Sequence, residues 1–328
     1  MFHKEKRNSK IMAVNTIQFK NVWHIKSIVS QLTFLNNLKK GDTVNIKFEF
    51  NATTIMPQYL AIIVSAINNA KAKGVNIVYP QYSHKNSGHN IKRHYNNYAS
   101  RMNFYKLLGI KSVEKFNRKN SDNNFIEITQ MDIISGKDKP DMDLVSEIIK
   151  IIKKHFDVDE TVWSTLNFCL WELVDNIKNH SGSNAKYTLV AQYYPKKEEI
   201  RFCIADNGIG IHRALTETEG SRYKNLTPYQ SISMCTNNSV TDGKGAGFGL
   251  YGYKNFVKAN HGQLIIYSGN YYQEVKDGKT IICNGANWQG TIIYNVIKTK
   301  NKVNYNDIFD GKVPTTVTEC EECINNLW

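Results

Sequence analysis

The sequence predicts an α/β protein in two parts: a smaller α/β domain over residues 1–138 and a two-layer α/β sandwich over residues 139–300. Three observations support this fold class. Residues 42–80 read as strand, helix and strand, residues 157–182 carry a helical apolar stripe, and residues 199–206 alternate as a strand. The polar segment "SGKDKPDM" marks the expected domain boundary, and residues 301–328 would form a C-terminal tail.

Composition narrows the class of protein. The chain of 328 residues carries a formal net charge of +13, but its lysines are spread along the whole sequence. We interpret this charge as a generally basic surface, and nucleic-acid binding is the less favoured alternative. The longest apolar run, residues 60–67, is too short to cross a bilayer, and the basic N-terminus lacks the apolar segment of a secretory signal. We therefore expect a cytoplasmic protein without membrane contact.

The cysteines give a weak signal. Six are scattered along the chain, and only Cys320 and Cys323 are closely spaced. One Cys-x-x-Cys without a second pair is a poor indication of zinc, so free thiols in a reducing compartment are expected.

The segment "DVDETVWSTLNFCLWELVDNIKNHSG", residues 157–182, predicts one long helix. Asp157 and Glu160 resemble a capping box at its start. Glu172 and Asn176 lie four residues apart and so share one face. An Asn oxygen can ligate Mg²⁺, while a Glu one turn away can orient or deprotonate a nucleophile. The alternative interpretation of this pair is a solvated helix face.

The segment "EIRFCIADNGIGIH", residues 199–212, predicts a strand that ends at Asp206 and is followed by a glycine-containing turn. An Asp at this position, beside glycines that keep the backbone open, can accept a hydrogen bond from an exocyclic amine. The alternative is an ordinary hairpin turn.

The segment "GKGAGFGLYG", residues 243–252, contains five glycines. It does not fit the phosphate loop of P-loop enzymes, because Gly245 follows Lys244 where Ser or Thr is required. A dinucleotide fingerprint fails as well, because a polar stretch precedes the glycines and no suitable acidic residue follows. The pattern G-x-G-x-G-L fits at residues 245–250, where glycines would close a mobile loop over a triphosphate and begin a helix.

The order of these three motifs resembles the GHKL superfamily of ATP-binding domains, shared by DNA gyrase, the heat-shock chaperone HSP90, MutL, histidine kinases and anti-sigma-factor kinases. "ELVDNIKNH" looks like the N box of that superfamily, "DNGIGI" like its first glycine box and "GAGFGLYG" like its second. The resemblance extends through "NHGQLIIYSG" and "WQGTIIYNV" and covers roughly residues 140–298. It implies a Bergerat-type ATP-binding fold with ATP and Mg²⁺ as ligands.

The resemblance also implies roles for single residues. Glu172 would be the catalytic base, Asn176 the Mg²⁺ ligand and Asp206 the residue that reads the adenine amine. Further cofactor-binding positions are Gly208 and Gly210 at the base, Lys244, Gly245, Gly247, Phe248, Gly249 and Leu250 near the phosphates, and His180 as a nucleotide neighbour. Lys244 could equally be a solvated lysine, and His180 a cation that offsets the helix dipole. Residues 212–244 fall where the superfamily has its ATP lid.

The N-terminal part resembles more loosely the STAS fold of anti-sigma-factor antagonists, over roughly residues 40–116. In that family a strand enters a helix at a regulatory serine. Here Met56, Pro57 and Gln58 occupy that place, which argues against a serine phosphoswitch.

Three functions remain open on this evidence. We rank first an ATP-dependent regulatory switch that acts on a protein partner or on its own STAS-like domain. The second is an ATPase or a Ser/Thr protein kinase of the anti-sigma type, and the third is a nucleic-acid-associated ATPase. Histidine autokinase activity is not expected, because His155 lacks the sequence context of a phosphoacceptor. The segment after Val296 is too short for the second domain of a clamp-type ATPase, and homodimerisation is left open.

Overall fold

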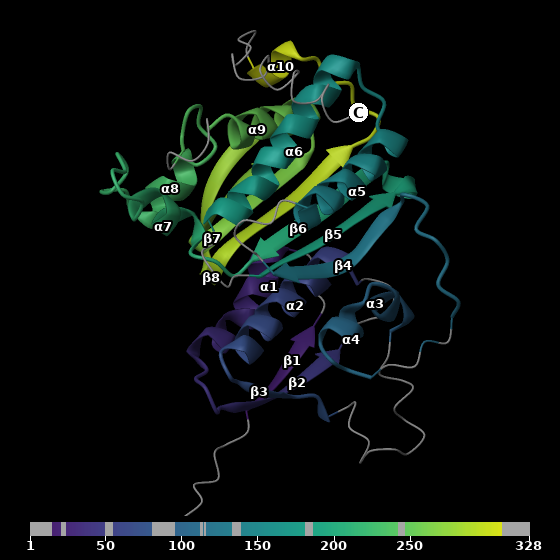
Figure 1. Cartoon of the computed structure of the whole chain (residues 1–328), viewed down its shortest axis with the longest axis vertical. Coiled ribbons are helices and arrows are strands. Elements are labelled where there is room, and N and C mark those ends of the chain that lie inside the picture. Colours follow the sequence, from purple (N-terminus) through teal and green to yellow (C-terminus); the bar gives the residue numbers. More distant parts are fainter. Residues whose placement is uncertain are drawn as a thin grey trace, which may run out of the picture.

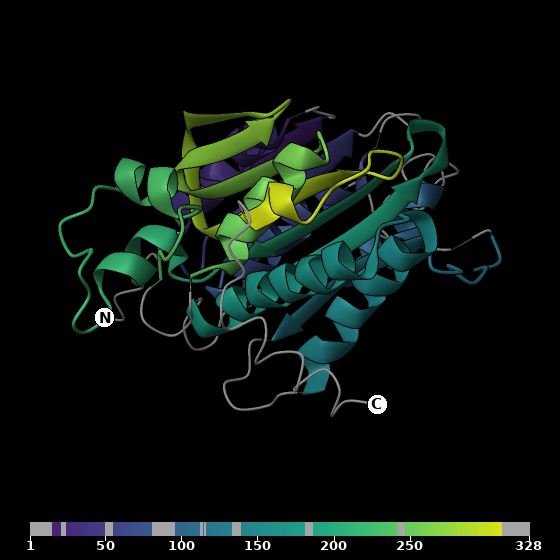
Figure 2. The ribbon, with the colours of Figure 1, turned by 90° about the horizontal axis from the view of Figure 1, so that it is seen from above.

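The computed structural model describes residues 15–20, 24–49, 55–80, 96–111, 114, 116–132, 139–180, 186–241 and 247–309. Within these ranges the strands form two sheets, one with the order β1-β2-β3 and one with the order β4-β5-β6-β8-β7 (Figure 1). The larger sheet lies between a layer of helices and the N-terminal part of the chain (Figure 2). The predicted mixed α/β class and the predicted sandwich of sheet and helices are confirmed.

The N-terminal part is a small parallel α/β unit. Its elements are β1 (Asn15–Lys20), α1 (Ile25–Leu32), the 3-10 helix η1 (Thr33–Asn37), β2 (Thr43–Glu49), α2 (Pro57–Ala72), β3 (Asn76–Val78), α3 (Asn97–Arg101) and α4 (Phe104–Leu107). The expected strand, helix and strand of residues 42–80 are therefore present as β2, α2 and β3. This parallel unit is compatible with the small α/β domain that the sequence predicts, and its specific likeness to STAS stays a prediction.

Helix α2 is the central element of this part. It begins at Pro57, where the missing N–H of proline has no intrahelical partner to lose. It ends at Lys73 and Gly74, and the φ of +85° at Gly74 turns the chain back toward β3. Most of its surface is buried, including Leu60 and Ile62, as expected for a helix that is apolar nearly all round.

The C-terminal part is an antiparallel sheet with helices on one face. Its elements are β4 (Phe125–Asp132), α5 (Lys139–His155), α6 (Glu160–His180), β5 (Lys186–Tyr194), the 3-10 helix η5 (Pro195–Lys197), β6 (Glu199–Asp206), α7 (Gly210–Thr216), α8 (Pro228–Met234), α9 (Gly249–Ala259), β7 (Gln263–Lys276), β8 (Lys279–Lys298) and α10 (Asn306–Phe309). Helices α5, α6 and α9 cover the sheet, while α7 and α8 lie beside one end of it (Figure 1).

Strand β4 belongs to the larger sheet, although it lies before the expected domain boundary. It precedes the boundary placed near residue 138, yet it pairs antiparallel with β5, from Phe125 opposite Gln192 to Asp132 opposite Lys186. The larger sheet therefore takes one edge strand from residues 125–132. The boundary itself stays a prediction.

Helix α6 differs from its prediction at the N-terminus. The structure begins the helix at Glu160, and the N–H of Val162 donates to Oδ1 of Asp159 at 2.9 Å. The capping carboxylate is thus Asp159 and not Asp157, because Asp159 directly precedes the first helical residue and occupies the N-cap position. The predicted apolar stripe, with Leu166 and Leu173, is buried.

Alternation along the strands gives the larger sheet two apolar faces. Ile200, Phe202 and Ile204 of β6 belong to the core beneath α5, α6 and α9. Cys203 and Ala205, on the opposite face, belong to the core that contains α1 and α2. The N-terminal part and the sheet thus share one continuous apolar core. Within the described residues, no helix is both long and apolar enough to cross a membrane.

Candidate functional site

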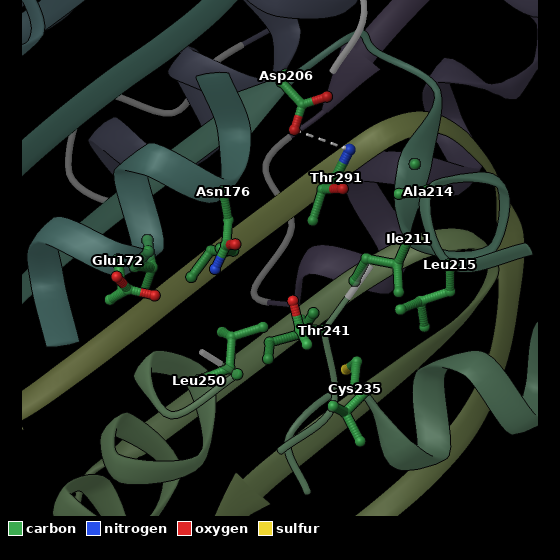
Figure 3. Close-up of a pocket in the computed structure, with 16 residues that line it drawn as sticks. Glu172, Asn176, Asp206, Ile211, Ala214, Leu215, Cys235, Thr241, Leu250 and Thr291 are labelled. Atoms are coloured by element: carbon green, nitrogen blue, oxygen red, sulfur yellow. Dashed lines mark hydrogen bonds between the residues drawn. The ribbon is translucent and has the colours of Figure 1, made fainter. Parts of the chain in front are cut away.

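A cavity of about 110 Å³ opens where α6, α7 and α9 meet the ends of β6, β7 and β8 (Figure 3). Six residues predicted for the site from the sequence line it: Glu172, Asn176, Asp206, Gly210, Gly247 and Leu250. The other lining residues are Leu173, Ile211, Ala214, Leu215, Cys235, Val240, Thr241, Ile266, Thr291 and Ile293. Motifs far apart in the sequence are therefore brought together.

Asp206 lies at the end of β6 and is 2% exposed. Its Oδ1 accepts a hydrogen bond from the N–H of Gly208 at 2.8 Å, and its Oδ2 accepts one from the N–H of Thr291 at 3.2 Å (Figure 3). Burial raises the pKa of Asp206 to about 7, although these two backbone N–H groups favour the charged form. The carboxylate is thus fixed in position, and in its ionised form it can accept a hydrogen bond from an amine.

Two glycines permit the close packing around Asp206. A Cβ atom at Gly290 would lie 2.3 Å from the main-chain oxygen of Asp206, and one at Gly210 would lie 2.6 Å from Oγ of Ser268. Both glycines also have positive φ angles, +94° and +77°. Ser268 completes the contact, since its Oγ accepts from the N–H of Ile211 and donates to the carbonyl of Gly290.

The wall beside Asp206 is apolar. Ile211, Ala214 and Leu215 of α7 face the cavity (Figure 3). Ile266 of β7 and Ile293 of β8 line it as well. The cavity therefore combines an apolar surface with one fixed hydrogen-bond acceptor at its end. Such a combination suits a flat heteroaromatic ring that carries an amino group.

The polar end of the cavity is formed by α6. Glu172 and Asn176 project into it from consecutive turns, as their spacing predicts (Figure 3). Burial raises the pKa of the Glu172 carboxyl above its usual value, and the neighbouring carboxylate of Asp175 adds to the rise. A Glu with a raised pKa is better suited to accept a proton at neutral pH.

Helix α9 begins against Glu172. A Cβ atom at Gly249 would lie 2.2 Å from Cβ of Glu172, so only glycine allows the first turn of α9 to approach α6 this closely. The positive end of the α9 dipole consequently lies near the polar end of the cavity, where it would favour an anion.

The residues present fit a magnesium ion that arrives with a nucleotide. The described residues contain no group of three or more His, Cys, Asp or Glu side chains that could hold a metal by themselves. Magnesium in phosphate-binding sites usually takes one or two protein oxygens and fills its shell with phosphate and water oxygens. The amide oxygen of Asn176, which lines the cavity, would supply such an oxygen.

The remaining predicted positions have different locations. Gly208 is buried and donates to Asp206, while Phe248 and Gly249 form the start of α9. Lys244 and Gly245 lie outside the described residues, as does the side chain of His180. Of the expected lid, residues 212–241 are described and include most of α7 and all of α8, whose N-terminus has a capping box formed by Thr227 and Gln230.

Several residues at the site were not predicted as site residues. Thr291 and Gly290 occur in "WQGTIIYNV", for which the sequence predicts only a closing strand. The available signal was the Gly-Thr pair at the start of an apolar run. The apolar wall from α7 had only a short signal, the helical spacing of Ile211, Ala214 and Leu215 over little more than one turn.

Comparison with known proteins agrees with this geometry over part of the chain. No curated protein matches the sequence. The family described as histidine kinase-, DNA gyrase B-, and HSP90-like ATPase matches residues 162–285, a range that holds α6, the end of β6, α7 and the start of α9. Residues 162–285 are therefore similar in sequence to this family of GHKL-type ATPase domains.

Proposed function

We propose that the cavity binds Mg-ATP and that the bound nucleotide controls the interaction of this protein with a protein partner. One observation carries the proposal: a buried carboxylate, Asp206, is held by two backbone N–H groups at the end of an apolar cavity. The match of residues 162–285 to an ATPase family supports the same ligand.

In the proposed complex the adenine lies against the apolar wall and its amine donates to Asp206. The phosphates extend toward α6 and the N-terminus of α9, which runs from Gly249 to Ala259. Asn176 would ligate Mg²⁺, which would neutralise phosphate charge. Gly247, whose φ is +73°, would present its backbone to the phosphates at the edge of the cavity.

The position of α7 and α8 supports the proposed control of a partner by the bound nucleotide. Helix α7 borders the cavity through Ile211, Ala214 and Leu215, and Cys235, the residue directly after α8, lines it as well. A nucleotide that contacts this segment stabilises one arrangement of it, and a partner that prefers that arrangement would distinguish the ATP-bound form from the empty form.

The raised pKa of Glu172 favours a second candidate, an enzyme that turns over ATP. Glu172 would accept the proton of a water or of a substrate hydroxyl as its oxygen attacks the γ-phosphorus, and ADP would leave. With water the product is free phosphate, and with a hydroxyl it is a phosphorylated Ser or Thr.

The test is to incubate the protein with Mg²⁺ and ATP labelled at the γ-phosphate, alone and with host-cell extract. We expect the label to remain largely on bound ATP, with slow release of phosphate that Glu172→Gln lowers by about 100-fold or more without loss of ATP binding. Glu160→Gln, in the first turn of the same helix, is the matched control and should leave release unchanged.

Label transferred to a protein band would establish the kinase instead. A wild-type protein that binds no ATP would contradict the proposal altogether.

A further inference from the structure

Helix α2 of the N-terminal part contacts the loop that follows Asp206. Nδ2 of Asn207 donates to Oγ of Ser65 at 3.0 Å and to the Ser65 carbonyl at 3.3 Å. Asn207 is the residue directly after the proposed adenine-reading carboxylate. The residue next to Asp206 is therefore hydrogen-bonded to a helix outside residues 162–285, the ATPase-like segment.

A second chain of contacts reaches the same loop from the end of α2. Nζ of Lys73 donates to Oε1 of Gln289 at 2.6 Å, and Nε2 of Gln289 donates to the carbonyl of Asn207 at 3.1 Å. Next to Gln289, Nε1 of Trp288 donates to the carbonyl of Asp206 at 3.1 Å. Both carbonyls of the Asp206-Asn207 pair are thus bonded to side chains of β8, and one of these side chains is held by α2.

The burial of Ser65 indicates that its hydroxyl serves this contact. Ser65 is fully buried, and it and Gln58 are the only polar residues among the buried residues described for α2. A buried hydroxyl costs free energy unless it is hydrogen-bonded, and alanine would fill the same space without that cost. The partner that compensates for its burial is Asn207.

Residues 206–208 consequently lie between the nucleotide cavity and helix α2. On one side Asp206 faces the cavity and accepts from Gly208. On the other side Asn207 faces α2. Besides the bond from Trp288, the N–H of Asn207 donates to the carbonyl of Lys186 at 3.3 Å. The bonds to Ser65 and Gln289 add the N-terminal part of the chain to the groups that fix this loop.

We propose that Ser65 and Lys73 are positioning residues of the nucleotide site, acting through Asn207 and Gln289 to place the Asp206 carboxylate opposite the base. The inference rests on the proposed binding of ATP and adds to it a role for the N-terminal part: α2 sets both the affinity for adenine nucleotides and the preference for adenine over guanine. Anything that displaces α2 would then change nucleotide binding.

The experiment measures the Kd values of ADP and GDP for the full chain by isothermal titration calorimetry, with Tm recorded in parallel. Losing one hydrogen bond of this kind corresponds to a change of about two- to tenfold in affinity. We expect Asn207→Ala and Ser65→Ala to weaken ADP binding by about this factor and to affect GDP less, so that the preference for ADP falls. Ser65→Ala should have the smaller effect, because the Ser65 carbonyl remains as an acceptor.

A double variant that combines Ser65→Ala with Asn207→Ala tests whether the two residues act through one contact. Since Ser65→Ala and Asn207→Ala remove the same contact, the double variant should bind ADP no more weakly than Asn207→Ala alone. Lys73 is exposed, so Lys73→Met tests the same role without disturbing the buried position of Ser65. This variant should also lower the preference for ADP.

Matched controls lie on the same helix. Asn68 also makes two hydrogen bonds, to the carbonyl of Leu107 at 3.1 Å and to Oε1 of Gln130 at 2.8 Å, and Nζ of Lys71 donates to the carbonyl of Leu108 at 2.7 Å. None of these acceptors lies in the 206–208 loop. Asn68→Ala and Lys71→Met should lower Tm and leave both Kd values unchanged.

The outcomes separate the two proposals. If Asn207→Ala and Lys73→Met lower Tm but keep the affinity and the base preference of the wild type, the positioning role is overturned while ATP binding stands. If the wild-type protein binds neither nucleotide, the proposed function itself fails, and the positioning role fails with it.

Discussion

Asp206 is subject to two opposing demands. Burial favours its neutral form and raises its pKa to about 7, whereas accepting a hydrogen bond from an amine requires the ionised form. The folded protein therefore loses stability when this carboxyl ionises. The bound amine would offset that loss, because it donates a hydrogen bond to the ionised carboxylate. A bound nucleotide would therefore stabilise the folded state.

This conflict gives a pH-dependent prediction for Asp206→Asn. The usual pKa of 3.8 rises to about 7 on folding, so the stabilising contribution is complete below pH 3.8 and is lost as pH rises through 7. The shift corresponds to about 4 kcal/mol at most. Asparagine does not titrate, so the Tm of Asp206→Asn should rise relative to that of the wild type between about pH 4 and pH 7 and stay level above that.

Thermal melts of both proteins across this range check the prediction. Parallel curves would show that Asp206 does not titrate as described. The same variant should lose binding of adenine nucleotides, because an amide cannot replace the carboxylate toward two N–H donors and an amine.

At this scale the sequence predicts side-chain chemistry better than backbone chemistry. Glu172, Asn176 and Asp206 can be picked out because their side chains and spacings carry a signal, and the structure brings them to one cavity. Their roles stay predictions. Thr291 was not predicted, because it holds Asp206 through its backbone N–H. Every residue except proline has this group, so it leaves no signal in the sequence.

At the level of elements, the contact between α6 and α9 controls the polar end of the cavity. The two helices meet where Gly249 lies against Glu172. A side chain at this point has no space, because the backbone of α9 and the Cβ of Glu172 already touch. The distance between the two helices, and hence the position of the α9 N-terminus, depends on this glycine.

Gly249→Ala should therefore push the helices apart. We expect a loss of about 1 to 3 kcal/mol in the free energy of unfolding, from overpacking, and a clear loss of ATP affinity. Lys258→Ala, about 13 Å further along the same helix, is the control and should change neither property. Urea denaturation and nucleotide titration measure both effects. Unchanged ATP affinity in Gly249→Ala would mean that the start of α9 does not contribute to binding.

The elements that the sequence predicts well are those with a strong apolar period. The helix expected over residues 157–182 is observed from Glu160 to His180. Helix α8 was not anticipated within the expected lid, because seven residues give too short a period to recognise. Strand β8 is 20 residues long, and its two ends differ: residues 292–297 are all buried, whereas residues 279–281 are exposed.

For the whole molecule, the central feature is the apolar core shared by the N-terminal part and the larger sheet. Phe104 of α4 and Ile62 of α2 belong to the same cluster as Tyr267 and Ile292 of the sheet. The sequence predicted the α/β class of each part but not this shared core. Alternation along a strand shows that two faces are apolar, but it does not show what covers each of them.

We expect this core to make the chain unfold as one cooperative unit. Scanning calorimetry should show a single transition that ADP shifts to higher temperature. Phe104→Ala, at a fully buried position far from the cavity in sequence, should lower that same transition by a cost of about 3 to 5 kcal/mol. Two transitions, with the ADP-sensitive one unaffected by Phe104→Ala, would contradict this expectation.

The edge strand β4 shows the same limit of sequence reasoning. The polar segment after it suggested a boundary near residue 138, but polarity reports exposure along the chain and not membership of a sheet. Residues 125–132 pair with β5, so the larger sheet begins before that segment.

The shared core also restricts how this protein could have arisen and diverged. Side chains of α2 and of the second face of the sheet fill the same space, so a larger residue on one side requires a smaller one on the other. Without the N-terminal part, Tyr267, Trp288 and Tyr294 of the larger sheet would lose the side chains that cover them. We therefore expect core residues of the two parts to change together in evolution, so that neither part could be exchanged alone for an unrelated domain.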